Sequence, residues 1–176
     1  WLDLTVDATA LPFMASSLGG LVLFDVLHHL AKPGKFLSEA NRVLRGGGRL
    51  ILCEPYVSPL SWPVYRFLHP EVVDFKVDPF ERPLPGADDP FAGNQAVPRL
   101  ILRERVRELG RWCPDLQMVT CETLAGPAYP ASGGFGRRSL MPSRAWRILL
   151  GLEDALPTRI FDLVGFRVFA VLEKRG

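Results

Sequence analysis

Residues 21–30 read Leu-Val-Leu-Phe-Asp-Val-Leu-His-His-Leu, an apolar run that gives way to polar side chains. The run Leu21 to Phe24 predicts a short strand buried on both faces, because it contains no polar residue. Asp25, His28 and His29 follow directly after it. Polar groups just past the end of a buried strand are typical of the ligand-binding crevice of an open α/β sheet.

A helix and a second strand come next in the chain. Residues 35–45 carry apolar side chains at helical spacing, and Gly46-Gly47-Gly48 predicts the end of that helix, because glycine tolerates a left-handed backbone. Residues 49–54 predict another buried strand, which leads into the polar residues Glu54 and Tyr56. Strand, helix and strand form a βαβ unit, so we expect Glu54 and Tyr56 to face substrate in the same crevice. The alternative is that they belong to a purely structural turn.

The composition indicates one domain with a sizeable core. The chain has 176 residues, 48% of them hydrophobic, and no window of roughly 20 apolar residues that would predict a membrane span. A net charge of +2 argues against a nucleic-acid-binding protein that relies on neutralising phosphates. The three cysteines follow neither a disulfide framework nor a zinc spacing, which suits a reducing, cytoplasmic compartment.

Residues 57–98 differ in character from the segments around them. Nine of the sixteen prolines lie between Pro55 and Pro98, interleaved with aromatic residues. So long a connection inside a domain is often functional. We expect a cap or lid that binds an apolar acceptor, with a short helix over residues 61–69; the alternative is an ordinary arm packed on the sheet.

The remaining segments predict further helices and strands. Strands are expected over residues 1–6, 116–124 and 163–173, and helices over 94–112 and 142–156. The arginines of the 94–112 helix suggest peripheral contact with an anionic membrane, or else the solvated face of a helix packed on the core. The Gly- and Pro-rich loop 127–135 is expected to bring Tyr129 to the crevice as a substrate-binding residue.

Three motifs carry a resemblance to a known family. They are Asp-Ala-Thr-Ala-Leu-Pro-Phe at 7–13, Leu-Phe-Asp-Val-Leu-His-His-Leu at 23–30 and Ala-Asn-Arg-Val-Leu-Arg-Gly-Gly-Gly-Arg-Leu at 40–50. In this order they resemble the class I S-adenosylmethionine-dependent methyltransferases that act on small molecules. The resemblance implies a Rossmann-like α/β sheet, mostly parallel, whose antiparallel last strand lies beside the strand ending at Glu54. It implies S-adenosylmethionine as cofactor.

The resemblance also assigns cofactor-binding residues. The Asp7 carboxylate would accept a hydrogen bond from the adenine amino group, a contact that suits an acceptor and a donor. The backbone of Ala8 would meet the edge of the ring. Phe24 and Asp25 would approach the amino acid end of the cofactor. The alternative for Asp7 is that its side chain caps the turn before residues 11–13.

His28 and His29 are the candidate catalytic residues. A histidine is able to act as general base toward a hydroxyl or amine that loses a proton during methylation. The alternative for each is that it caps or packs the start of a helix. No metal site is expected, because two adjacent histidines point in different directions and no carboxylate cluster joins them.

The chain departs from the family pattern as well. The glycine-rich loop that holds the methionine end of the cofactor, and the acidic residue that holds the ribose, are expected upstream of Trp1. Gly46 stands where the family usually has proline, and Gly19-Gly20 where it usually has aspartate. We therefore expect residues 1–176 to be a single partial domain, truncated at its N-terminus, with the strand at residues 21–24 left as an open sheet edge.

Two functions follow from these observations. The first is methyl transfer to a small, apolar or lipid-linked acceptor, impaired in a chain without the glycine-rich loop. The alternative is a non-catalytic methyltransferase-like remnant that serves as a binding or interaction module.

Overall fold

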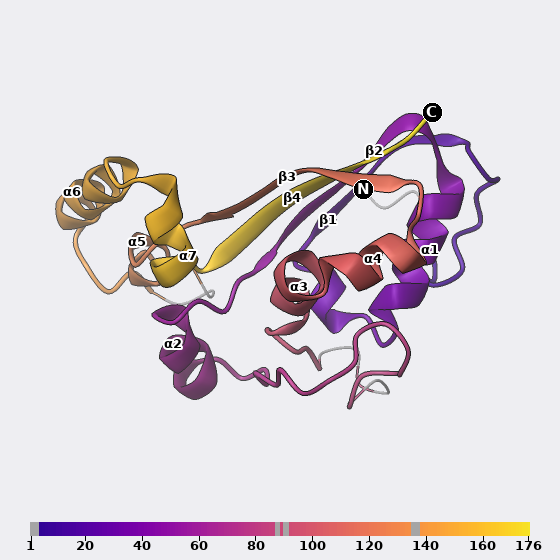
Figure 1. Ribbon diagram of the computed structural model, residues 1–176. Helices are drawn as coiled ribbons and strands as arrows, with labels where there is room; N and C mark the ends of the chain where they lie inside the picture. Colours follow the sequence, from indigo (N-terminus) through magenta and orange to yellow (C-terminus); the bar gives the residue numbers. More distant parts are fainter. Residues whose placement is uncertain (1–3, 87–88, 90–91, 135–137) are drawn as a thin grey trace.

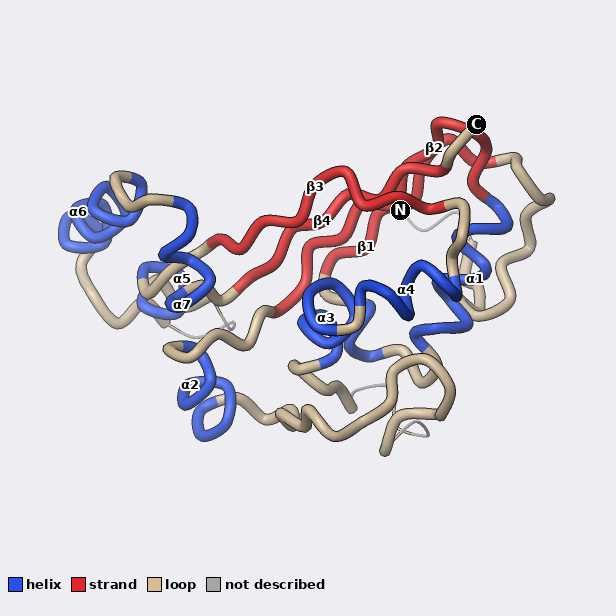
Figure 2. The backbone as a smooth tube through the Cα atoms, viewed as in Figure 1, coloured by secondary structure: helices blue, strands red, loops and turns tan. Residues whose placement is uncertain are grey.

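The computed structural model describes residues 4–86, 89, 92–134 and 138–176. Its centre is a four-stranded sheet in the order β1-β2-β4-β3. Figures 1 and 2 show helices α1, α3 and α4 packed along one side of this sheet, and α5, α6 and α7 gathered beyond one of its ends. The strands are β1 (Leu18–Phe24), β2 (Leu44–Pro55), β3 (Leu116–Leu124) and β4 (Arg167–Lys174).

The strand directions confirm the expected α/β sheet. β1 pairs with β2 in parallel, and β4 lies antiparallel between β2 and β3. β1, β2 and β3 therefore run the same way, and the last strand lies beside the one that contains Glu54. β4 begins four residues later than predicted, because η3 (Thr158–Ile160) and α7 (Phe161–Val164) occupy the segment before it.

The three glycines do not end a helix, so that expectation was wrong. Helix α1 (Pro33–Val43) stops before them, and they lie inside β2, where the pairing with β1 shifts register between Leu18 and Gly20. A Cβ on Gly48 would lie 2.8 Å from the carbonyl oxygen of Arg45 and 3.0 Å from that of Leu18. The glycines thus allow a bulge in which the backbones approach closely.

The strand β1 is not buried on both faces, which corrects a second expectation. It forms an edge of the described sheet, and its Val22 and Phe24 side chains are 71% and 65% exposed. Residues Leu4 to Val6 are exposed and form no strand, while residues 1–3 of the predicted first strand lie outside the described part. In the described part of the chain no strand pairs with the outer edge of β1, so this edge of the sheet stays open.

The main core lies between the sheet and the helices on its covered side. It joins residues from β2, β4, η1 (Leu27–His29), α1 and the segment near residue 100, and its fully buried members include Leu27, Phe36, Leu37, Leu50, Leu52, Ile101 and Leu172. Burying side chains of this size away from water is the main source of stability in a domain. Residues 57–98 take part, since Phe80 and Leu84 belong to the same core.

The helix predicted over residues 94–112 is divided into three consecutive helical segments of different geometry. They are α3 (Val97–Arg99), the π-helical η2 (Leu100–Glu104) and α4 (Val106–Trp112), with a break at Arg105. Arg99 pairs with Glu104, Arg103 with Asp162, and Arg105 with both Asp78 and Glu108. These arginines are thus engaged within the protein, which favours the packed alternative over a membrane-facing one.

Two further helices agree closely with expectation, α2 (Ser61–Leu68) and α6 (Ser143–Asp154). The short helix α5 (Ala128–Ala131) lies in the segment 127–135, which was predicted to be a loop. In the described part of the chain, no helix combines the length and the apolar character that crossing a membrane requires.

Candidate functional site

A pocket opens where β1 and β2 end. Asp25, the first residue after β1, has a left-handed backbone with φ of 56°, a conformation that aspartate tolerates better than most residues. Its N–H donates to the carbonyl of Cys53 at 3.1 Å, and its carboxylate lies 2.5 Å from Nη1 of Arg167. Unusual backbone conformations of this kind cluster at functional sites.

Arg167 is the first residue of β4 and is 6% exposed. Its Nη2 donates to the carbonyl of Cys53 at 3.1 Å. Burial alone would lower the pKa of Arg167, but the ion pair with Asp25 outweighs burial and raises it. The guanidinium also lies over the rings of Phe24 and Tyr129, at 5.1 and 5.9 Å. Arg167 therefore links the ends of β1, β2 and β4.

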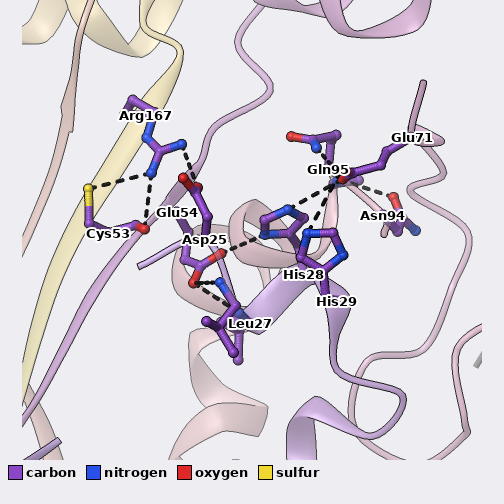
Figure 3. A network of polar contacts seen from close by, with 12 residues as sticks. Asp25, Leu27, His28, His29, Cys53, Glu54, Glu71, Asn94, Gln95 and Arg167 are labelled. Atoms are coloured by element: carbon purple, nitrogen blue, oxygen red, sulfur yellow. Dashed lines mark hydrogen bonds and ion pairs between the residues drawn. The ribbon is translucent and has the colours of Figure 1, made fainter. Parts of the chain in front are cut away.

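Glu54 is fully buried near the end of β2 and holds the turn that follows β1. Its Oε1 accepts the N–H groups of Val26 and Leu27, each at 2.9 Å. Its Oε2 lies 2.7 Å from Nδ1 of His28 (Figure 3). A buried carboxylate with this many donors is well compensated for its loss of solvent.

His28 is 3% exposed and lies between two carboxylates. Nε2 of its ring is 3.3 Å from Oε2 of Glu71. Burial would lower the pKa of His28, but hydrogen bonds to Glu54 and Glu71 outweigh it and raise the pKa to about 9. The same contact with His28 lowers the pKa of Glu71 against its own burial. An imidazole that keeps its proton at neutral pH is a poor general base.

His29 lies beside His28 and faces the same glutamate. The two ring centroids are 4.1 Å apart, and Nε2 of His29 is 3.8 Å from Oε1 of Glu71. Nδ1 of His29 is 3.2 Å from the carbonyl oxygen of Ala92. The sequence argument that adjacent histidines point apart is therefore wrong here, because the short helix η1 turns both rings toward Glu71 (Figure 3).

The resulting pocket has a volume of about 220 Å³. All three histidines of the chain line it, since His69 of the residue 57–98 segment joins His28 and His29. Its other lining residues are Asp25, Pro55, Tyr65, Glu71, Gln95, Tyr129, Gly134 and Arg167. The predicted residues Asp25, His28, His29 and Tyr129 thus come together around one cavity.

A larger hollow of about 690 Å³ adjoins this pocket and shares His29 and Glu71 with it. Its remaining lining residues are mostly apolar: Pro70, Val72, Pro85, Gly86, Asp89, Ala92 and Gly93. A volume of this order is typical of small-molecule sites. The two hollows together offer a polar end and an apolar end.

Other predicted residues lie outside the pocket. Tyr56 is 6% exposed and belongs to the main core, and Glu54 acts from beneath the pocket through His28. Asp7 is exposed, and its Oδ1 accepts the N–H of Thr9 at 2.7 Å and its hydroxyl at 2.9 Å. Those hydrogen bonds, the backbone one foremost, lower the pKa of Asp7 and make it a turn cap. Ala8 is half-buried against the core.

The sequence around this site is similar to that of known proteins. Residues 3–52, which contain all three motifs quoted above, match the family model described as a methyltransferase domain. Over this stretch the chain is similar to a methyltransferase domain.

Two curated relatives are demethylmenaquinone methyltransferases. A demethylmenaquinone methyltransferase of Streptomyces avermitilis is 30% identical over 92 residues, which are 52% of this chain and 39% of that protein. A demethylmenaquinone methyltransferase of Clavibacter sepedonicus is 39% identical over 54 residues, 31% of this chain and 22% of that protein. The matched stretch is therefore well under half the length of either relative.

Solved structures also overlap with this chain. A geranyl diphosphate C-methyltransferase from Streptomyces coelicolor covers 96% of this chain with a TM-score of 0.47 and 13% identity, the overlap being 52% of that protein. An overlap with a TM-score of this size carries no argument about function.

Sequence reasoning missed Glu71, Gln95, His69, Tyr65 and Arg167. None belongs to the three methyltransferase motifs, and four of them come from the proline-rich segment or its edge. One signal was present in the sequence: His69 is the third of only three histidines, and Glu71 follows it two residues later. Their position against His28 and His29 depends on the path of a long connection.

Proposed function

We propose that the protein acts in methyl transfer from S-adenosylmethionine to a small, apolar or lipid-linked acceptor. This proposal rests on the match of residues 3–52 to a methyltransferase domain. The match ends within β2, and the pocket lies where that strand ends. The reaction would take place at the carboxyl ends of β1 and β2, where open α/β sheets bind their ligands.

The cofactor side of the site would be formed by Asp7, Ala8, Phe24 and Asp25. The exposed carboxylate of Asp7 fits the adenine amino group, because a carboxylate accepts and an amine donates. The exposed ring of Phe24 and the left-handed backbone of Asp25 offer an accessible strand end beside it. The residues present therefore fit the cofactor, whose sulfonium would supply an activated methyl group.

The acceptor side would lie at the two hollows that share His29 and Glu71. Their polar and apolar ends suit an acceptor with a reactive polar head and an apolar body. A demethylmenaquinone-like quinol is the first candidate, because the curated relatives carry that name. Tyr129 and the cap formed by residues 57–98 would complete the wall around it.

The protein's own groups would mainly position the acceptor and exclude water. Methyl transfer is a direct displacement, so orientation and desolvation supply much of the rate. His29 and His28 would act on the polar head of the acceptor, with Glu54 holding the turn that carries them. We also place the protein in the cytoplasm, which suits its three free cysteines.

Calorimetry with S-adenosylhomocysteine tests the cofactor side. The chain should bind it in a saturable manner, and Asp7→Ala should weaken binding about tenfold, as loss of a hydrogen bond to a charged group predicts. Glu81→Ala, an exposed carboxylate elsewhere, serves as the control. Transfer of a labelled methyl group to a demethylmenaquinone analogue tests the acceptor. Absence of both binding and transfer would contradict the proposal.

A second candidate function is a non-catalytic interaction module. It is favoured by the edge strand β1, whose exposed Val22 and Phe24 would suit pairing with a strand of another chain. Val22→Lys should then abolish association of the protein with another chain, as measured by sedimentation-velocity ultracentrifugation. The far-UV circular dichroism should stay unchanged. A protein that binds the cofactor product and stays monomeric would exclude this candidate.

A further inference from the structure

We infer that His28, His29 and Glu71 form a binding site for a divalent transition-metal ion such as Zn²⁺. The three residues offer two imidazole nitrogens and a carboxylate, and their ligand atoms lie within 4.8 Å of one another. Two histidines with one glutamate make up a known class of metal site that leaves a position open for a further ligand.

The hydrogen-bond partners of the two rings direct their electron pairs to one place. Nδ1 of His28 faces the Glu54 carboxylate, and Nδ1 of His29 faces the carbonyl of Ala92. Both partners are pure acceptors, so each Nδ1 carries the hydrogen. At neutral pH the second proton of His28 lies on Nε2, toward Glu71. A metal ion would displace it, and with Nε2 unprotonated each ring presents a lone pair toward the negatively charged Glu71. Three acceptors that converge in this way need a cation between them.

The spacing suits a metal ion in that position. Nε2 of His28 lies 3.3 Å from one oxygen of Glu71, and Nε2 of His29 lies 3.8 Å from the other. Ligands held at metal distances of roughly 2.0–2.1 Å in a tetrahedral site are separated by roughly 3.3 Å. The His28 distance already equals this separation, and the His29 distance lies somewhat beyond it.

The surroundings match those of metal-binding histidines. Such a histidine nearly always donates its other ring N–H to a carboxylate or a backbone carbonyl, which fixes the ring. Glu54 provides the first kind of partner and Ala92 the second. Glu54 is itself held by the N–H groups of Val26 and Leu27, so the support of His28 is rigid.

Gln95 provides a second, independent observation. It is 1% exposed, lines the same pocket and donates from Nε2 to Glu71, while its Oε1 has no hydrogen-bond partner in the described chain (Figure 3). An unpaired buried oxygen is costly. A water on the metal's open position would give this oxygen a donor.

The alternative trio of Asp25, His28 and Glu54 is a weaker candidate. Both oxygens of Glu54 already accept hydrogen bonds, and Asp25 is paired with Arg167. Metal binding there would have to break these contacts. At the Glu71 cluster a metal ion would replace the contacts of His28 and His29 with Glu71, while the contacts of both Nδ1 atoms would stay in place.

Zinc titration tests the inference on metal-stripped protein, by calorimetry in the absence of cofactor and acceptor. We expect saturable binding of one Zn²⁺ and an increase in the melting temperature on adding zinc. Glu71→Gln and His29→Ala should each weaken binding about tenfold or more. Glu81→Gln, a charge-matched change on the same proline-rich segment, should leave it unchanged. Circular dichroism of each metal-free variant establishes that it is folded.

The inference is overturned if the wild-type protein shows no saturable zinc binding, which would leave a proton as the cation between these groups. It is equally overturned if folded Glu71→Gln and His29→Ala bind zinc as the wild type does. Because the titration contains neither cofactor nor acceptor, its result is separate from the fate of the proposed methyl transfer.

Discussion

Nδ1 of His28 lies 2.7 Å from Oε2 of Glu54, a carboxylate with no solvent-exposed surface. The same carboxylate accepts the N–H groups of Val26 and Leu27 through its other oxygen. One side chain of β2 therefore fixes both the backbone turn after β1 and the imidazole that the turn carries. This relationship makes Glu54 a positioning residue, placed beneath the pocket.

Removing Glu54 should be strongly destabilising. Glu54→Ala leaves the N–H groups of Val26 and Leu27 and the His28 side chain without their acceptor, and breaking a buried charge pair costs about 3–5 kcal/mol. Urea denaturation measures the free energy of unfolding. Glu104→Ala, which breaks the partly exposed pair with Arg99, should cost less than about 1 kcal/mol. Similar losses for both variants would refute the role assigned to Glu54.

Two helical glycines should respond to alanine in opposite ways. A Cβ on Gly34 in α1 would lie 2.7 Å from the carbonyl oxygen of Phe80, whereas one on Gly110 in α4 would meet no atom within 4 Å. Gly34→Ala should therefore destabilise the protein by about 1–3 kcal/mol through overpacking. Gly110→Ala should stabilise it by up to about 1 kcal/mol, because alanine is the better helix former. Thermal unfolding of both variants checks the signs.

Arg167 should contribute more to stability than an ordinary surface arginine. Arg167→Leu removes the donor to the Cys53 carbonyl and the partner of Asp25, with an expected loss of about 1–3 kcal/mol. The expected loss is moderate because Asp25 is 39% exposed and keeps part of its hydration. Arg49→Leu breaks the exposed pair with Glu173 and should cost below about 1 kcal/mol. Equal midpoints in urea for the two variants would contradict this ranking.

The cysteines should differ in reactivity. Cys113 is fully buried, and burial raises the pKa of its thiol to about 12, so almost no thiolate is present near pH 8. Iodoacetamide should leave Cys113 unmodified in the native protein. In protein unfolded in urea it should modify all three cysteines. Peptide mass spectrometry identifies the sites. Rapid labelling of Cys113 in the native protein would show that the core near α4 opens readily.

The sequence was informative wherever a structure depends on neighbours along the chain. The strand at residues 116–124, the helix near residues 61–69 and the antiparallel last strand were all predicted correctly. Hydrophobic periodicity and motif spacing are local signals, and these elements follow them. The bulge at the three glycines was missed because it depends on the close approach of distant backbone, and the break at Arg105 was missed as well.

The sequence identified the pocket residues that lie in the motif at 23–30. It did not identify the residues that contact them. The polar groups after the first two strands follow from the βαβ pattern, so Asp25, His28 and His29 were found at the pocket. The sequence did not predict that the rings of His28 and His29 point toward the same residue. Glu71 and Gln95 reach them through a long proline-rich connection, and Arg167 reaches Asp25 across the sheet. Local sequence specifies backbone shape, whereas contacts between residues far apart in the chain arise when the whole core packs together.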